Sequence, residues 1–538
     1  MTKPGLQLHR GLMLCASIAL LFASFIYAIY AANLLAFPYD YDQGEGFELH
    51  DTTLLSQFRL PYLDTETYPF YSSNYPPLYH ILAAPFVWLF GPAYWYGRLL
   101  GFAASLLIAV SIAFAVYRDG HQNRWIALLA GLAFLSSNFV YHIGPLFRQN
   151  IMMVAFETVA IVLLARAFPR GDKRGITLAL FCLLCAGYTK QMAAITALAA
   201  IGWMFLRGPR RALLYTAGFG LAGGLVFLWL DLASGGQWWR QAIVANVNDF
   251  LYDQAVGLFR LWFGLHGFLL VPAALMTLVE LYADRLSIYS FWFLAAALLG
   301  GAAAGTWGAG DSYLVTSIAA ACILSGIFFS RLLANAWGPS RILQVLPLAR
   351  LASLSLLLVP LLYLGYARAT LKMPTGGAFA PLAELLGVER NVAFHTRPDA
   401  PDFYDSAGWL AGGYARIGYL LTEADHAAGD QIVTYIQQTD KPVLSEDAGF
   451  SIVAERDVVT NPTQLRNLYL AGQFAGDELA RMIEHQEFGL IILRAQFFPP
   501  HILEAMGQAY IHKETIFMNG FDYLLLFPRP GYEPRETA

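Results

Sequence analysis

The chain is organised by long apolar stretches that alternate with short loops rich in arginine. Eleven stretches are candidate membrane spans, and they cover residues 11–35, 95–117, 125–143, 151–167, 176–189, 190–206, 212–231, 258–281, 286–305, 313–330 and 351–367. Within lipid only helices and closed barrels satisfy every backbone hydrogen bond, and a spanning helix needs about 20 mostly apolar residues. Since 13% of the residues are charged, against about a quarter in an average soluble domain, we predict a polytopic α-helical membrane protein with about eleven transmembrane helices.

The basic loops predict how the chain crosses the membrane, because cytoplasmic loops are enriched in lysine and arginine. Clusters of arginine occur at Arg118–Arg124, Arg166–Arg174, Arg207–Arg211, around Arg285, and at Arg331–Arg350. These loops and the basic N-terminus lie on the same side of the membrane only if the segment 76–90 does not cross the membrane. We therefore expect Pro76–Phe90 to form an interfacial or shallow re-entrant helix, started by two prolines.

An odd number of spans then places the first loop, residues 36–94, and the C-terminal region on the non-cytoplasmic side. The expected location is a bacterial inner membrane, with both parts on the periplasmic or extracellular side. We divide the chain into a transmembrane domain, residues 1–368, and a soluble domain, residues 369–538.

The soluble domain is expected to combine helices and strands. Segments 426–438 and 477–486 are amphipathic with helical periodicity. Segments 442–445, 451–459, 489–493 and 523–527 are short runs of apolar and β-branched residues, which predict strands. Strands that alternate with helices favour a small α/β domain with a partly parallel sheet.

The first loop carries five acidic residues soon after the first apolar stretch. They are Asp40, Asp42, Glu45, Glu48 and Asp51. A charge beside a membrane span needs water, a partner or a function. This loop is therefore where we expect the chemistry of the protein.

Several short motifs in and after this loop occur in a fixed order. They are Asp42-Gln43-Gly44-Glu45, Pro76-Pro77-Leu78-Tyr79, Leu89-Phe90-Gly91 and Arg98-Leu99. In this order they resemble the integral-membrane glycosyltransferases of the GT-C superfamily. The closest pattern is that of glycosyltransferase family 39 and its relatives, the protein O-mannosyltransferases and the lipid A aminoarabinose transferase. The resemblance covers residues 10–335 approximately, and it implies a GT-C-like helical domain that transfers a sugar from a polyprenyl-phosphate donor.

Two later segments extend the resemblance, and one position departs from it. Gly187–Lys190 resembles the family segment whose lysine meets the phosphate of a polyprenyl carrier, and Gly310–Leu314 resembles the segment that opens a late span. Asn150, two residues after Arg148, stands where relatives often have an acid. A divalent metal would therefore lack an acidic ligand at this position, and no cofactor is predicted.

The acids of the first loop suit the base that such a transfer needs. A carboxylate within hydrogen-bond reach of an acceptor hydroxyl or amine can remove its proton. Asp42 is the predicted base, and Asp40 is the reserve candidate. Glu45, one turn later if the segment is helical, would orient the acceptor or the partner of the base. The alternative for each acid is a solvated loop carboxylate.

The leaving phosphate needs cations, because negative charge develops on it. Lys190 lies between two apolar stretches, and a lysine at the bilayer centre costs about 2.5 to 3.5 kcal/mol. We expect it at the outer boundary with an anion; snorkelling to solvent is the alternative. Arg148 and Arg98 are further phosphate candidates, although Arg98 could equally anchor its helix among headgroups. The predicted substrate-binding side chains are Tyr75, Tyr79, His80 and Tyr313.

Together these observations predict a membrane glycosyltransferase that works on the outer face of the membrane. Its partners would be a polyprenyl-phosphate-linked sugar, the lipid bilayer, and an acceptor lipid, glycan or protein. The net charge of −4 gives no basic surface for nucleic acid. The alternatives are a multi-span transporter or flippase of a lipid-linked or small solute, and a membrane-anchored binding module. Charges that gather outside the spans, instead of along a path through them, favour the enzyme.

Overall fold

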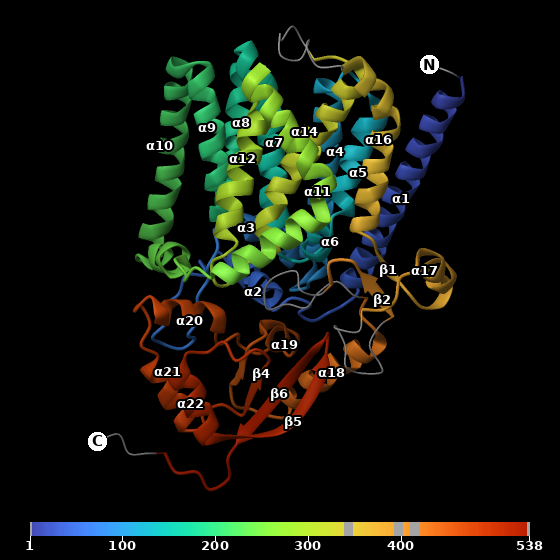
Figure 1. Cartoon of the computed structure of the whole chain (residues 1–538). Coiled ribbons are helices and arrows are strands. Elements are labelled where there is room, and N and C mark those ends of the chain that lie inside the picture. The colour runs from blue at the N-terminus through green and yellow to red at the C-terminus, as the bar shows by residue number, and fades with distance from the viewer. Residues whose placement is uncertain (1–2, 284, 338–347, 392–401, 409–419, 535–538) are drawn as a thin grey trace.

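A helical bundle and a C-terminal domain packed against one end of it make up the molecule (Figure 1). The computed structural model describes residues 3–283, 285–337, 348–391, 402–408 and 420–534. α14 is the most deeply buried of the long apolar helices, whereas α10 lies at the edge of the bundle and is almost wholly exposed. The hydrophobic core therefore centres on α14.

A helix occupies each of the eleven predicted spans. The helices are α1 (Lys3–Leu35), α4 (Trp95–Asp119), α5 (Arg124–Ser136), α7 (Gln149–Arg170), α8 (Lys173–Thr189), α9 (Ala194–Arg207), α10 (Pro209–Ala233), α11 (Tyr252–Ala283), α12 (Ile288–Ala295), α14 (Val315–Ala334) and α16 (Leu348–Ala369). Within the described part of the chain, six helices are long and apolar enough to cross a membrane. The predicted class is confirmed, and the number that cross stays a prediction.

Two of the predicted spans are interrupted. The expected 125–143 helix ends at Ser136, and α6 (Asn138–Ile143) begins after Ser137, whose hydroxyl accepts a hydrogen bond from the N–H of Val140. Such a cap starts a new helix within an apolar run. The expected 286–305 helix contains a π-helical segment, Ala296–Gly300, and ends with α13 (Gly301–Ala303).

The segment with two prolines forms a short helix, α3 (Leu78–Phe90). Its 13 residues reach about 20 Å, which is less than the roughly 30 Å hydrocarbon core of a bilayer. One face is buried, and Leu82 and Leu89 on the other are exposed. These features agree with an interfacial helix, although its position in a membrane stays a prediction.

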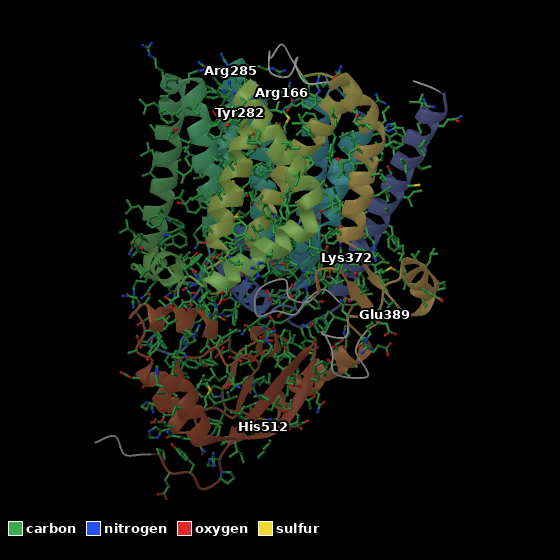
Figure 2. The ribbon with its side chains drawn as sticks, in the orientation of Figure 1. Arg166, Tyr282, Arg285, Lys372, Glu389 and His512 are labelled. Carbon is green, nitrogen blue, oxygen red and sulfur yellow. The ribbon has the colours of Figure 1, made fainter. Side chains whose placement is uncertain are left out.

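The basic loops that the structure describes gather away from the C-terminal domain. Figure 2 shows Arg166 and Arg285 at the far end of the bundle, while Lys372 lies at the boundary with the C-terminal domain. Part of the predicted loop Arg331–Arg350 lies outside the described residues. The arrangement agrees with the predicted orientation, which itself stays a prediction.

The C-terminal domain is built on a four-stranded sheet of order β3-β4-β6-β5. β3 (Val443–Ser445) pairs in parallel with β4 (Leu490–Leu493), with Leu444 opposite Ile491. β6 (Phe521–Pro528) is antiparallel to β4 and to β5 (Tyr510–Met518). The helices of this domain are α18 (Glu423–Gln437), α19 (Ala448–Val453), α20 (Pro462–Leu470), α21 (Asp477–Glu484) and α22 (Pro500–Ala509). The predicted partly parallel sheet is confirmed.

Between α16 and α18 the chain forms smaller elements, β1 (Lys372–Pro374) paired with β2 (Phe403–Asp405), and α17 (Ala380–Leu386). The predicted strand 451–459 is wrong, because residues 448–453 form α19 instead. Phe450 on this helix is buried against the rings of Tyr39 and Tyr523. Packing across the domain boundary therefore outweighs the local strand-like pattern.

Candidate active site

The acidic loop lies between the bundle and the C-terminal domain. After Gln43 the chain forms α2 (Gly44–Ser56), which Figure 1 shows at the lower end of the bundle, beside α19. The five acids nearest the first span, Asp40, Asp42, Glu45, Glu48 and Asp51, are all buried. Glu45, Glu48 and Asp51 follow one another at intervals of three, so they share one face of α2. Since buried charges need partners, the contacts of each acid decide its role.

Glu45 is fixed by Arg98, which is fully buried in α4. Both carboxylate oxygens accept from Arg98, over 3.0 and 2.7 Å, and also from the backbone N–H groups of Phe147 and Tyr41. Arg98 also donates to the backbone carbonyls of Leu34, Phe37 and Tyr39. These bonds use the five N–H groups of a guanidinium.

The predicted phosphate role of Arg98 is therefore wrong, because no N–H group remains for a ligand. Arg98 instead ties the end of α1 to the acidic loop. Glu45 was predicted to orient the acceptor or the partner of the base. Its contacts favour a positioning role for the loop backbone.

Asp42 faces a different arginine, Arg148, the residue that caps the N-terminus of α7. Their side chains approach to 3.3 Å and remain slightly exposed, 9% for Asp42 and 11% for Arg148. Arg148 also lies 3.9 Å from Glu48. The guanidinium rests directly on Gly44, where a Cβ would lie 1.0 Å from Nη1. Glycine at this position is therefore what lets Arg148 reach Asp42.

Further inside, Glu48 and Asp51 share His80 of α3. His80 Nε2 lies 2.6 Å from Glu48 and 3.9 Å from Asp51. Burial raises the pKa of Asp51 to about 7, although His80 and the hydroxyl of Ser73 oppose the rise. Burial alone would lower the pKa of His80, but the hydrogen bond and the charge of Glu48 outweigh it and raise that pKa.

Two predicted substrate-binding residues belong to this packed interior. His80 is fully buried against Glu48, and Tyr79 is fully buried and donates to the carbonyl of Gly97 over 3.0 Å. These contacts favour a structural role for both side chains, and their predicted substrate contacts stay a prediction. They hold α3 against α2 and α4.

The other two predicted substrate-binding residues surround Lys190, which follows α8 directly. The ammonium of Lys190 lies over the rings of Tyr75, at 5.3 Å, and Tyr313, at 4.6 Å. It also donates to Asn150 Oδ1, and Lys190, Asn150 and Tyr313 line a small cavity. The structure thus brings the predicted phosphate-binding residue Lys190 together with two of the predicted substrate-binding residues, Tyr75 and Tyr313.

Lys190 and Arg148 are close enough to interact electrostatically, and both lie by the N-terminus of α7. Helix N-termini carry unpaired N–H groups and a partial positive charge, which favour anions. A buried lysine, an arginine and a helix N-terminus together form a site suited to a phosphate. A carboxylate, Asp42, adjoins it.

The C-terminal domain closes over the acidic loop. Asp40 accepts hydrogen bonds from the backbone N–H groups of Gly46 and, over 2.9 Å, of Gly449 in α19. Asn519, in the turn between β5 and β6, donates to the carbonyl of Tyr41 over 2.6 Å. Burial, with the nearby charge of Asp447, raises the pKa of Asp40 well above its usual value. Asp40 therefore joins the two domains through hydrogen bonds to the backbone on both sides of the boundary.

Arg494, after β4, is a residue that the sequence did not single out. It is 1% exposed and lies 3.7 Å from Asp447, yet its three side-chain nitrogens make no hydrogen bond within the part of the chain that is described. Its charge acts on Asp42 as well as on Asp447. Glu446, the neighbour of Asp447, accepts hydrogen bonds from the four backbone N–H groups of residues 494–497.

The described residues contain no group of three or more His, Cys, Asp or Glu side chains arranged to hold a metal ion. Asn150, at the position where an acid is common in the resembled family, is bound to Lys190.

Comparison with known proteins agrees with this geometry. The family model described as dolichyl-phosphate-mannose-protein mannosyltransferase matches residues 74–232, whereas no curated protein sequence matches the chain. The structure is similar to that of ArnT from Cupriavidus metallidurans in the apo state, with a TM-score of 0.55, 13% identity, and coverage of 96% of this chain and 98% of that chain.

ArnT from the same organism bound to undecaprenyl phosphate matches with a TM-score of 0.52 and 14% identity, covering 96% of this chain and 97% of that one. An Archaeoglobus fulgidus oligosaccharyltransferase tethered to an acceptor peptide matches with a TM-score of 0.49, 12% identity, and coverage of 96% and 74%. The predicted GT-C-like fold and the resemblance to glycosyltransferase family 39 are confirmed.

Proposed function

We propose that this integral membrane protein of GT-C fold is a glycosyltransferase that moves a sugar from a polyprenyl-phosphate donor to an acceptor on the outer face of the membrane. One observation carries the proposal: Asp42, Arg148 and Lys190 converge from three distant parts of the chain. The description of the matching family model and the undecaprenyl phosphate bound to ArnT support a lipid-phosphate donor.

In the proposed reaction Asp42 takes the proton of the acceptor hydroxyl or amine as that atom bonds to the anomeric carbon of the sugar. The bond between that carbon and the phosphate oxygen breaks, and the electron pair leaves with the polyprenyl phosphate. Arg148 and Lys190 stabilise the charge that develops on the leaving phosphate. A positioned base typically contributes about 10²- to 10⁴-fold to the rate.

Arg148 has two tasks in this scheme, because it pairs with the base and also faces the phosphate site. Lys190 is held in place by Asn150 and by the rings of Tyr75 and Tyr313. These rings line the approach to the lysine and would contact the donor. The acceptor, a lipid, glycan or protein, would reach Asp42 from the side of the C-terminal domain. The location that we propose is a bacterial inner membrane, with the site on the periplasmic side.

The test is transfer of radiolabelled sugar from a panel of polyprenyl-phosphate sugars to membrane extract by purified protein. We expect Asp42→Asn to lower transfer by at least about 100-fold, since the amide cannot accept the proton. The matched control is Asp64→Asn, an exposed acid of the same loop, which should retain full activity. A fully active Asp42→Asn protein would refute the base. Absence of transfer from every donor by folded wild-type protein would favour a transporter.

A further inference from the structure

A pocket of about 610 Å³ opens at the end of the bundle opposite the C-terminal domain. It lies among the ends of α4, α7, α9, α10, α11, α12 and α14, and Figure 2 labels Arg285 at this end. Four arginines line it: Arg207, Arg211, Arg285 and Arg331. They come from three separate connections of the bundle. The proposed transfer reaction uses none of them.

The acids that line the same pocket are engaged elsewhere. Asp119 pairs with Arg118 through both oxygens, over 2.8 and 2.7 Å, and accepts from the hydroxyl of Tyr289. Glu280 accepts one hydrogen bond from the backbone N–H of Ser287 and one from the hydroxyl of Ser290, each over 2.7 Å. The lining arginines therefore outnumber the lining acids, and both acids are held by other groups.

Two of these arginines, Arg207 and Arg211, are positioned by neutral groups. Arg207 donates to the carbonyl of Leu286 over 2.6 Å, and Arg211 donates to the carbonyl of Phe168 over 3.2 Å. The guanidinium of Arg211 also lies 4.8 Å from the centre of the Phe168 ring. Planar guanidinium groups held in this way suit the oxygens of a phosphate.

We propose that this pocket binds the phosphate headgroup of an anionic phospholipid. Basic pockets between transmembrane helices on the cytoplasmic side suit such headgroups, and the predicted orientation places this end there. Exposed apolar side chains on the same helix ends, Phe205, Leu206 and Tyr282, would contact the acyl chains. A general excess of arginine on the cytoplasmic side does not require four of them to line one pocket.

The experiment measures lipid binding to the full-length protein by native mass spectrometry in detergent. Phosphatidylglycerol and phosphatidylcholine with the same acyl chains are titrated against wild type, Arg211→Gln/Arg285→Gln and the control Arg170→Gln/Arg174→Gln. The control arginines lie at the exposed end of α7 and start of α8 and do not line the pocket. Thermal unfolding checks that each variant is folded.

We expect the pocket variant to bind phosphatidylglycerol more weakly by on the order of thirtyfold, since two cations near the headgroup are lost. Phosphatidylcholine binding and the control variant should be unchanged. Equal affinity of wild type and pocket variant for phosphatidylglycerol would overturn the proposal, as would an equal loss in the control. Displacement of the lipid by millimolar inorganic phosphate would assign the pocket to a soluble anion instead.

Discussion

Replacing Gly44 by alanine should separate catalysis from folding. A Cβ at this position would lie 1.0 Å from Nη1 of Arg148. The side chain of Arg148 is flexible, so it must move by about 2.5 to 3 Å to restore van der Waals separation, while the backbone stays in place. That movement takes Nη1 out of the range of its 3.3 Å ion pair with Asp42.

The loss can be estimated from the type of contact. A hydrogen bond to a charged group contributes about 1.5 to 3 kcal/mol, which corresponds to about 10- to 150-fold in kcat/KM. The melting temperature should change little, because alanine is a better helix former than glycine and the clash falls on a side-chain end. Sugar transfer and thermal unfolding of the same purified sample measure both quantities.

The matched control is Gly187→Ala, which makes the same chemical change near Lys190. A Cβ on Gly187 meets nothing within 4 Å, so this variant should keep full activity. A Gly44→Ala protein with wild-type kcat/KM would refute the reasoning, since it would show that the position of Arg148 does not matter. Equal loss in both variants would point to a general effect of alanine.

Three further predictions concern residues around this ion pair. Lys190→Ala should raise the KM for the lipid donor at least about tenfold, because a charge-assisted contact to phosphate is lost. Initial rates measured against donor concentration test this, and an unchanged KM would exclude Lys190 from the phosphate site. Arg494→Met should lower transfer at least about tenfold. Because the change also leaves Asp447 buried without its counter-charge, thermal unfolding of the same sample must show that the variant is folded; full activity in folded protein would show that the charge acting on Asp42 is dispensable. Asp51, with its pKa raised to about 7, holds its proton in the folded state after the unfolded chain has lost it, so its stabilising effect is complete below about pH 4 and declines as the pH rises toward 7. The melting temperature should therefore fall between about pH 4 and pH 7, and fall less in Asp51→Asn, whereas identical pH profiles would contradict this.

The helical part of the fold could be predicted because hydropathy is a local property. Each apolar stretch needs only its own residues to be recognised, so a helix is found at every predicted span. The break at Ser137 could not be predicted, since the serine stands within an apolar run and acts through the cap of α6. The strand prediction for residues 451–459 failed for another reason. The conformation of α19, which forms there, depends on contacts with the distant first loop.

The candidate site was predictable in its residue types and less so in their roles. The sequence predicts site roles for Asp42, Arg148 and Lys190, because each is a charged residue beside a span or part of a family motif. In the structure these three residues lie together. Arg98 and His80 were predicted on the same grounds, but in the structure they are the buried partners of Glu45 and Glu48, respectively. A sequence motif cannot distinguish a residue that contacts the substrate from one that holds the loop in place, since both kinds occur in the same motifs, near the same acidic residues.

The residues that the C-terminal domain contributes could not be found from the sequence. Asn519 and Arg494 lie more than 400 residues after Asp42 along the chain, and no local pattern marks them. Asn519 is recognisable only as a turn residue, which its positive φ of 54° confirms. Their roles depend on how the C-terminal domain packs against the bundle, because both residues act on the acidic loop across the boundary between the two domains.

The pairing of the buried acids explains why Asp42 is the best base among them. Glu45 would have to give up contacts with Arg98, and Asp40 its bonds to two backbone N–H groups, before either accepted a proton from a substrate. Asp42 is held by an ion pair of 3.3 Å to Arg148 and is slightly exposed. In the proposed reaction, when Asp42 takes the proton, Arg148 loses the nearer of its two acidic neighbours and keeps only Glu48, at 3.9 Å, so more of its positive charge acts on the leaving phosphate. Proton transfer to the base and stabilisation of the leaving group are thereby coupled through one arginine.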